Sequence, residues 1–207
     1  TVTIFVAYQE FNEILTEDGI VIHFISKKKY PVANWFFYKK YLSHYINRVV
    51  KSKGIDLIEA PDWTGITAFM HIDVPLVIRI HGSDAYFCNL EKREQKKKNL
   101  LLEKKNLFKA DAVVAVSDFA AQVTKEIFNY NKEISIIHNS IDCVKFQPLS
   151  LDVKANSILY FGTVIRKKGV LDLANAFNIV AGKNPYATLT VIGKDVVDFK
   201  TGSSTVD

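Results

Sequence analysis

Short apolar segments alternate with longer amphipathic segments along most of the chain, and this alternation constrains the fold more than any other feature. The segment Ala112–Val116 is apolar at every position, as expected for a parallel strand that is covered on both faces. Strands that alternate with helices build βαβ units. The pattern therefore predicts an α/β fold with doubly wound parallel sheets.

The pattern also places the individual elements. The expected strands are Thr3–Ala7, Ile20–Ile25, Ile55–Glu59, Pro75–Ile80, Ala112–Val116, Ile134–Ile137, Ile158–Phe161 and Thr188–Ile192. The expected helices are Asn34–Lys51, Thr64–His71, Glu91–Phe108, Asp118–Asn129 and Val170–Ala181.

A chain of 207 residues is long enough for one large domain or two small ones. The periodicity lapses over Asp142–Ala155, where Pro148 and Ser150 lie among polar residues typical of a linker. We expect an N-terminal Rossmann-like domain at residues 1–148 and the start of a second Rossmann-type domain at residues 149–207. Two strands and one helix cannot cover both faces of a parallel sheet, so we expect the natural protein to continue past Asp207.

The net charge of +5 is distributed unevenly. Lys27–Lys53 holds eight basic and no acidic residues, and Lys92–Lys109 holds eight basic and two acidic residues. Together these segments carry +14, which leaves about −9 for the remainder. Such segregation indicates a basic face that meets an anionic partner.

The helices expected in the basic segments 34–53 and 92–109 permit two interpretations. The first helix carries an apolar stripe with Lys and Arg at other positions. Such a helix can lie on an anionic membrane surface, or it can face the core with a solvated basic back. Nucleic acid is not expected as a partner, because no recognised binding motif accompanies the charge.

Several classes of protein are disfavoured. No apolar run approaches the ~18–20 residues that span a bilayer, and Thr1–Tyr8 lacks the features of a signal peptide. Cys88 and Cys143 form no C-x-x-C pair. We therefore expect a cytoplasmic protein, with peripheral attachment to the inner face of the membrane as the alternative. No nucleotide-loop, Ser-hydrolase, Cys/His or Asp-x-Asp motif occurs, so neither a metal nor a cofactor is expected.

The clearest candidate site is the segment Ile158–Gly169. It reads as a buried strand, then Gly162 and Thr163, then the cations Arg166, Lys167 and Lys168 before a helix. Free backbone N–H groups and the helix dipole attract an anion at such a turn. The segment predicts binding of a phosphate or diphosphate, and hence of a nucleotide-linked substrate.

A second candidate follows the strand Pro75–Ile80, because ligands bind at the carboxyl ends of strands in open α/β sheets. It contains Arg79, His81 and Gly82. The His81 ring can donate or accept a hydrogen bond near neutral pH, and Gly82 permits close backbone approach. The alternative is a turn with a hydrogen-bonded histidine.

Four further polar residues follow other strands. Glu59 and Asp62 can bind sugar hydroxyls beside Trp63, or Asp62 can cap the helix expected from Thr64. Ser117 can cap the next helix or contact a phosphate. Asn139, within His138–Asp142, can line a cleft or belong to a polar turn.

In this order and spacing, the motifs resemble those of retaining glycosyltransferases of family 4. The matching segments are Arg79–Gly82, Ala110–Ser117, His138–Asp142 with Phe146 and Pro148, Ile158–Gly169, Ala174–Phe177 and Leu189–Gly193. The resemblance implies a GT-B fold, with two Rossmann-like domains and the active site between them. It also implies transfer of a sugar from a nucleotide-diphosphate donor to a glycan or lipid-linked acceptor, as in surface polysaccharide synthesis.

The resemblance assigns roles to individual residues. His81 matches the histidine that contacts the donor sugar, and Lys168 matches the lysine that holds the diphosphate. Thr163 stands where many members have an arginine, a role that Arg166 can take over. The family's first strand with its glycine-rich loop has no match here. A pair of glutamates in the second domain also has none, so this chain alone is not expected to turn over.

Two rival functions remain open at this point. One is a sugar-nucleotide epimerase of the GT-B type, which would need acidic residues placed for elimination chemistry. The other is a non-catalytic protein that binds a membrane surface through the two basic helices.

Overall fold

The computed structural model describes residues 1–148, 153–198 and 200–206. It divides into two compact units, Thr1–Ser140 and Ile141–Asp207, which are considered separately. The domain boundary predicted at residues 148–149, like Ser150 of the expected linker, touches the segment 149–152 outside the described residues.

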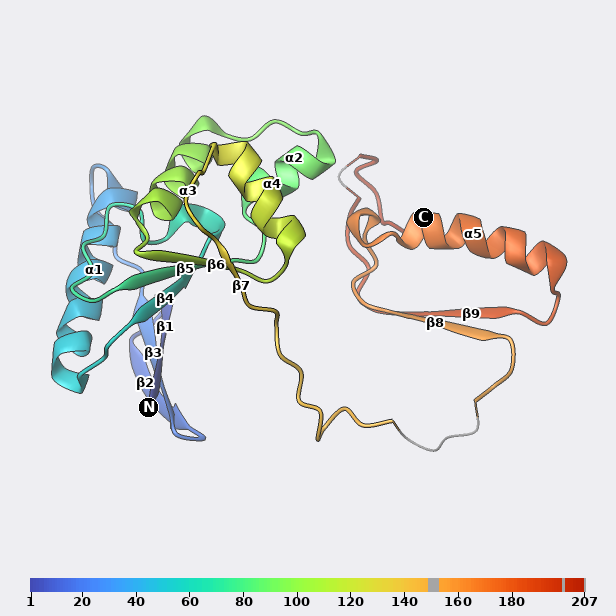
Figure 1. The fold of residues 1–207 in the computed structure, drawn as a ribbon, viewed down its shortest axis with the longest axis horizontal. Helices are drawn as coiled ribbons and strands as arrows, with labels where there is room; N and C mark the ends of the chain where they lie inside the picture. Colours follow the sequence, from blue (N-terminus) through green and yellow to red (C-terminus); the bar gives the residue numbers. More distant parts are fainter. Residues whose placement is uncertain (149–152, 199, 207) are drawn as a thin grey trace. The chain divides into compact units, whose positions relative to one another are not determined.

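The first unit contains a four-stranded parallel sheet in the order β4-β5-β6-β7. Its strands are β4 (Ile58–Pro61), β5 (Leu76–Ile80), β6 (Ala112–Ala115) and β7 (Ser135–Ile136). The helices α2 (Asp84–Glu91), α3 (Lys97–Lys109) and α4 (Asp118–Phe128) gather on one side of this sheet (Figure 1). Buried side chains of β5 and of these helices form its core, which includes Ile78, Leu107 and Phe128. The parallel sheet confirms the predicted α/β class.

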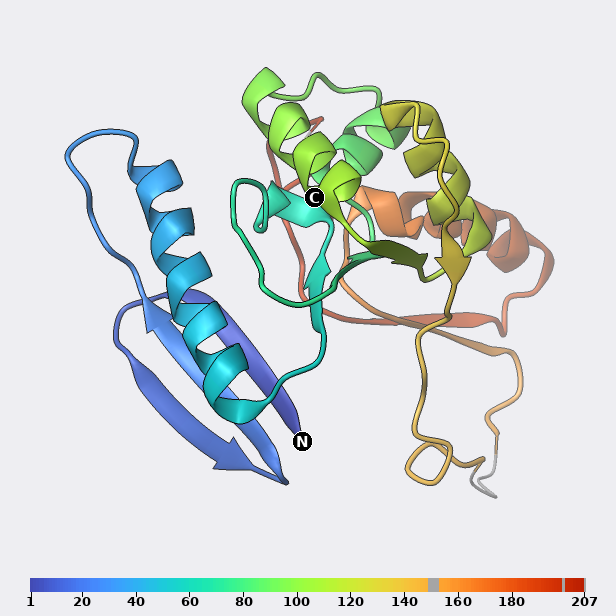
Figure 2. The ribbon, with the colours of Figure 1, turned by 60° about the vertical axis from the view of Figure 1, so that its left-hand side comes forward.

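The same unit contains a second sheet in the order β1-β3-β2. Its strands are β1 (Val2–Gln9), β2 (Glu13–Glu17) and β3 (Ile20–Ser26). The helix α1 (Asn34–Lys53) lies along this sheet (Figure 2), and Tyr38 and Leu42 pack with Ile25 and Met70 in a second core. The apolar stripe of α1 is therefore core-facing, as in the second of the two interpretations above.

Strand β2 was not expected, and it pairs antiparallel with β3. Its sequence, Glu-Ile-Leu-Thr-Glu, lacks the longer apolar run that identified other strands, and every residue of β2 is exposed. The sequence signal for the hairpin lies in its turn. Asp18 and Gly19 both have positive φ (50° and 77°), the geometry that an Asp-Gly pair favours between two strands.

The helix expected at Thr64–His71 is wrong, because only a 3₁₀ turn at Trp63–Gly65 forms there. Side chains satisfy backbone groups of this segment in place of a helical ladder. Lys39 of α1 donates to the carbonyls of Gly65 and Ile66, and Lys109 of α3 donates to the carbonyl of Met70. A lysine on each neighbouring helix thus holds the segment in an irregular conformation.

The helix expected at Glu91–Phe108 begins later, at Lys97 of α3, and α2 before it was not expected. Helix α2 ends at Lys92, whose left-handed backbone (φ 53°) closes the last turn. The Arg93 guanidinium then pairs with Glu91 and Asp84 and holds the chain back against α2. The strand expected at Ile55–Glu59 begins later, at Ile58.

The second unit begins a second parallel sheet. Strands β8 (Ser157–Phe161) and β9 (Thr188–Ile192) pair in parallel, with α5 (Val170–Lys183) alongside them in Figure 1. The backbones cross closely just after both strands, where a Cβ on Gly193 would lie 1.7 Å from the Gly162 carbonyl oxygen. Glycine at position 193 therefore permits this crossing.

Candidate active site

The register of the four-stranded sheet brings the predicted residues of the first unit to one edge. Pro61 pairs with Arg79, Ile80 with Ala115, and Ala115 with Ile136, so the carboxyl ends of β4 to β7 lie side by side. The candidate residues lie in or just after these ends: Glu59 and Asp62 at β4, Arg79, His81 and Gly82 at β5, Ser117 after β6, and Asn139 after β7. The structure therefore gathers them at the edge where α/β proteins bind ligands.

Arg79 and Glu59 form an ion pair with one another. The guanidinium donates to both carboxylate oxygens of Glu59 at 2.8 Å, and it also reaches the Ile137 carbonyl at 3.5 Å. The hydrogen bond from Arg79 lowers the pKa of Glu59. A bidentate pair of this kind fixes two neighbouring strands at the edge and keeps both charges oriented.

Asp62 holds the loop that carries His81. Its carboxylate accepts the backbone N–H groups of His81 and Gly82 at 3.2 and 3.1 Å. Burial raises the pKa of this carboxyl group, and the two backbone hydrogen bonds oppose that rise. Asp62 makes no side-chain cap on the following 3₁₀ turn, so the capping interpretation is wrong.

The loop is further restricted by Gly82. Its φ of +121° lies where side chains are rarely tolerated, and an added Cβ would meet the rings of Phe87 and Tyr86 at 3.1 to 3.2 Å. The His81 side chain beside it is exposed. Because the backbone on both sides is fixed, the imidazole is presented from a rigid loop at the edge of the sheet.

Three further residues, Glu103, Ser83 and Asn106, hold the backbone of this region in place. Glu103 of α3, only 2% exposed, accepts the N–H groups of Asp84 and Ala85 at 3.0 Å and so caps α2. Ser83 accepts the N–H of Tyr86, also at the start of α2. Asn106 donates to the Pro61 carbonyl. No local signal identifies Glu103, because its partners lie almost 20 residues earlier.

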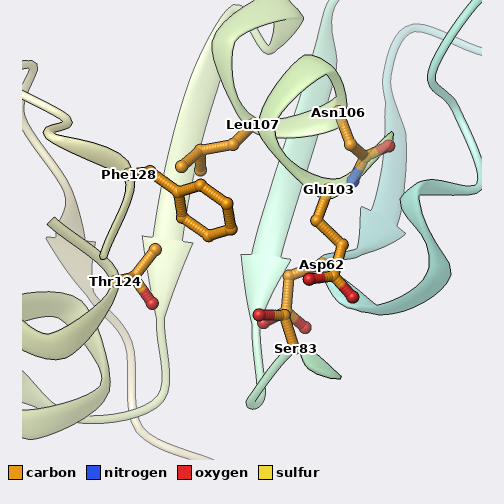
Figure 3. Close-up of a pocket in the computed structure, with 7 residues that line it drawn as sticks. All are labelled: Asp62, Ser83, Glu103, Asn106, Leu107, Thr124 and Phe128. Carbon is orange, nitrogen blue, oxygen red and sulfur yellow. The ribbon is translucent and has the colours of Figure 1, made fainter. Parts of the chain in front are cut away.

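A small cavity lies beneath the loop (Figure 3). It is lined by Asp62, Ser83, Glu103, Asn106, Leu107, Thr124 and Phe128. Its volume of about 10 Å³ is near the lower limit for one water molecule. A sugar or nucleotide does not fit in this space.

Ser117 and the segment after β7 form local contacts. The Ser117 hydroxyl accepts the N–H of Ala120 and caps α4, the structural alternative that we considered. Nδ1 of His138 lies 2.9 Å from the Val116 carbonyl, and both His138 and Asn139 are exposed. These two side chains therefore stand at the same edge as His81.

A larger cavity of about 1440 Å³ lies between the two sheets of the first unit. Residues of β1 line one side, and Ile55–Pro61 lines the other. Both strands are the edge strands of their sheets. Most of the exposed lining is apolar, with Leu42, Ile46 and Met70 among the lining side chains.

In the second unit, the predicted cationic loop forms a 3₁₀ turn, Arg166–Lys168, that leads into α5. The turn uses some of the N–H groups that were expected to be free, since Lys168 N–H donates to the Ile165 carbonyl and Gly169 N–H to the Arg166 carbonyl. Gly162 N–H is also used, by the Ile192 carbonyl.

The cations of this loop are in different environments. The Arg166 guanidinium forms a bidentate pair with Asp198 at 2.5 and 3.0 Å, which lowers the pKa of that carboxyl group to about 2. The Lys168 side chain is exposed one residue before Gly169, the N-cap of α5. Thr163 is exposed at the end of β8. The geometry thus leaves Lys168 facing solvent at the helix start.

Within residues 1–148, 153–198 and 200–206, no three His, Cys, Asp or Glu side chains are grouped so that they could hold a metal ion. In the same ranges, no helix has the length and apolar character needed to cross a membrane.

The first unit is therefore an α/β unit with a polar edge at the carboxyl ends of a parallel sheet. A family model for Glycosyltransferase Family 4 matches residues 1–145. This match covers well over half of the chain, and the chain belongs to glycosyltransferase family 4. It confirms the family predicted from the motifs. No curated protein sequence matched the chain.

Proposed function

We propose that the chain is part of a retaining glycosyltransferase that moves a sugar from a nucleotide-diphosphate donor to a glycan or lipid-linked acceptor. The observation that carries the proposal is the exposed His81 on a loop fixed by Asp62, at the ligand-binding edge of a family 4 domain. Surface polysaccharide synthesis is the process in which we expect such a transfer.

In this proposal the second unit holds the donor diphosphate. Lys168 is exposed beside the N-terminus of α5, where its charge and the helix dipole both favour an anion. Arg166, paired with Asp198, holds the loop in place, and Gly162 and Thr163 lie at the end of β8. Lys168 and the helix dipole would neutralise charge on the diphosphate without a metal ion or a cofactor.

Donor binding is tested by calorimetry with nucleoside diphosphates on the complete protein. We expect Lys168→Ala to abolish binding. Lys183→Ala removes the same charge from the far end of α5 and should leave binding unchanged. Unchanged affinity in Lys168→Ala would remove this residue from the donor site.

The role of His81 is tested by measuring sugar transfer separately from nucleotide binding. His81→Ala should lose transfer and keep nucleotide affinity, because the ring would act at the reaction centre and not on the diphosphate. His71→Ala serves as the control, since that side chain is 87% exposed and precedes the amino end of β5, whereas His81 follows its carboxyl end. Retained transfer by His81→Ala would exclude the catalytic role.

A further inference from the structure

The two basic segments of the chain meet at one place in the folded first unit. The Lys98 ammonium of α3 lies 4.8 Å from the centre of the Trp35 ring, in the first turn of α1. Lys105, two turns further along α3, lies 4.2 Å from the centre of the Phe69 ring. More than 50 residues separate Trp35 from α3 in the sequence, so only the fold creates this cluster.

Aromatic side chains form the base of the cluster. The Phe69 ring lies 5.5 Å from Trp35 and 5.9 Å from Phe36, and Phe37 lies 5.7 Å from Phe36. Trp35 and Phe37 remain 37% and 40% exposed although they belong to this aromatic group. Large apolar rings that remain at the surface next to cations are typical of sites that contact other molecules.

The charge around these rings has one sign. Helix α1 contains no acidic residue, and the one acidic residue of α3, Glu103, is buried as the cap of α2. Lys40, Lys98 and Lys105 each lie over an aromatic ring, and within the described ranges none of the three forms a salt bridge. Neither helix therefore presents a carboxylate to an approaching anion.

We propose that Trp35, Phe37, Lys40, Lys98 and Lys105 form a docking patch for an anionic lipid surface. Tryptophan and phenylalanine partition into the headgroup region of a bilayer, and lysines beside them are attracted to anionic lipids. Only the first two turns of α1 take part, since Tyr38 and Leu42 of its apolar stripe pack in the core with Ile25. The patch is thus smaller than the two whole helices that the sequence indicated.

This inference is independent of sugar transfer, because vesicle binding needs neither donor nor acceptor. It bears on the proposed function only in favouring a lipid-linked acceptor over a soluble glycan. A failure to bind vesicles would not contradict the proposed sugar transfer. A failure of sugar transfer would not contradict the proposed docking patch.

The test uses intrinsic fluorescence and vesicle co-sedimentation of the 207-residue chain. Trp35 and Trp63 are its two tryptophans, so a Trp63→Phe background leaves Trp35 as the single reporter. We expect a blue shift and sedimentation with phosphatidylglycerol vesicles but not with pure phosphatidylcholine vesicles. Salt at about 1 M should abolish binding, because it shortens the Debye length to about 3 Å.

Variants then locate the contact. Removing one lysine near an anionic surface corresponds to about fivefold in affinity, so Lys98→Ala with Lys105→Ala should weaken vesicle binding about 25-fold. The matched control is Lys51→Ala with Lys53→Ala, which removes the same charge from the other end of α1, roughly 25 Å away. Equal weakening in both pairs would overturn the patch.

Two further outcomes would also overturn the proposal. One is an unshifted Trp35 spectrum in the presence of phosphatidylglycerol vesicles. The other is tight, salt-sensitive binding to duplex DNA or RNA without vesicle binding, which would show that the basic surface serves nucleic acid instead.

Discussion

The Asp62 carboxylate accepts the backbone N–H of His81 at 3.2 Å, so a residue at the end of one strand fixes the loop that follows the next strand. The register that pairs Pro61 with Arg79 makes this contact possible. The orientation of the exposed imidazole therefore depends on Asp62, a residue that is itself only 6% exposed.

Asp62→Asn should loosen this loop and leave the sheet intact. An amide can accept from one N–H group, but its NH₂ group cannot accept from the second. We expect a loss of about 1–3 kcal/mol in the free energy of unfolding and faster amide exchange at His81 and Gly82. Asp56→Asn, at an exposed position before β4, is the control. Unchanged exchange at both amides would contradict the positioning role.

Gly193→Ala should severely destabilise the second unit. Its Cβ would lie 1.7 Å from the Gly162 carbonyl oxygen, and backbone cannot move aside cheaply. Gly182→Ala is the matched control, because nothing lies within 4 Å of its Cβ and alanine favours a helix by up to about 1 kcal/mol. Thermal unfolding followed by circular dichroism should show opposite shifts, and equal shifts would contradict the close crossing.

Thr124→Val should be neutral or stabilising. Among the described residues, the buried Thr124 hydroxyl has no hydrogen-bond partner, and valine has nearly the same shape. Thr67→Val is the contrasting variant, because the Thr67 hydroxyl donates to the buried Asn106 side chain. Urea unfolding should show a loss of about 1–3 kcal/mol for Thr67→Val alone. A comparable loss in Thr124→Val would contradict this assignment.

Because of Lys39, the free energy of unfolding should change with pH in the alkaline range. Burial first, and then the charges of Lys98 and Lys109, lower the pKa of its ammonium from 10.5 to about 8. Between these values the unfolded chain binds more protons than the folded chain, so the free energy of unfolding rises with pH. Above about pH 10 the raised pKa values of Tyr8 and Tyr38 act in the opposite direction.

The measurement is denaturant unfolding between about pH 8 and pH 10. The slope with pH should be smaller in Lys39→Met, although that variant is less stable overall because Gly65 and Ile66 lose their donor. Lys40→Met changes an exposed neighbour and should keep the slope. An identical slope in Lys39→Met would refute the lowered pKa.

The elements that the sequence predicted correctly are those with a local signal. Helix α4 has the Ser117 cap at its start, and β5 and β6 are short apolar runs. The edge position of His81 also followed from local order, because it comes directly after β5. The sequence was sufficient to place a residue wherever its position depends only on the element that directly precedes it.

The errors arise where distant side chains replace local hydrogen bonds. The segment from Thr64 is not helical because Lys39 and Lys109 satisfy its carbonyls from two other helices. The ion pair between Arg79 and Glu59 depends on the strand register, which the sequence does not reveal. The Arg166–Asp198 pair likewise joins residues 32 positions apart.

The two edge strands beside the large cavity differ in how well they resist pairing with a foreign strand. Along β4, the charge of Glu59 and the missing donor of Pro61 discourage an incoming peptide. From Val2 to Tyr8, β1 has neither a charged residue nor a proline. When molecules of this unit collide at high concentration, aggregation should therefore start along β1, and a lysine placed there would act as a gatekeeper.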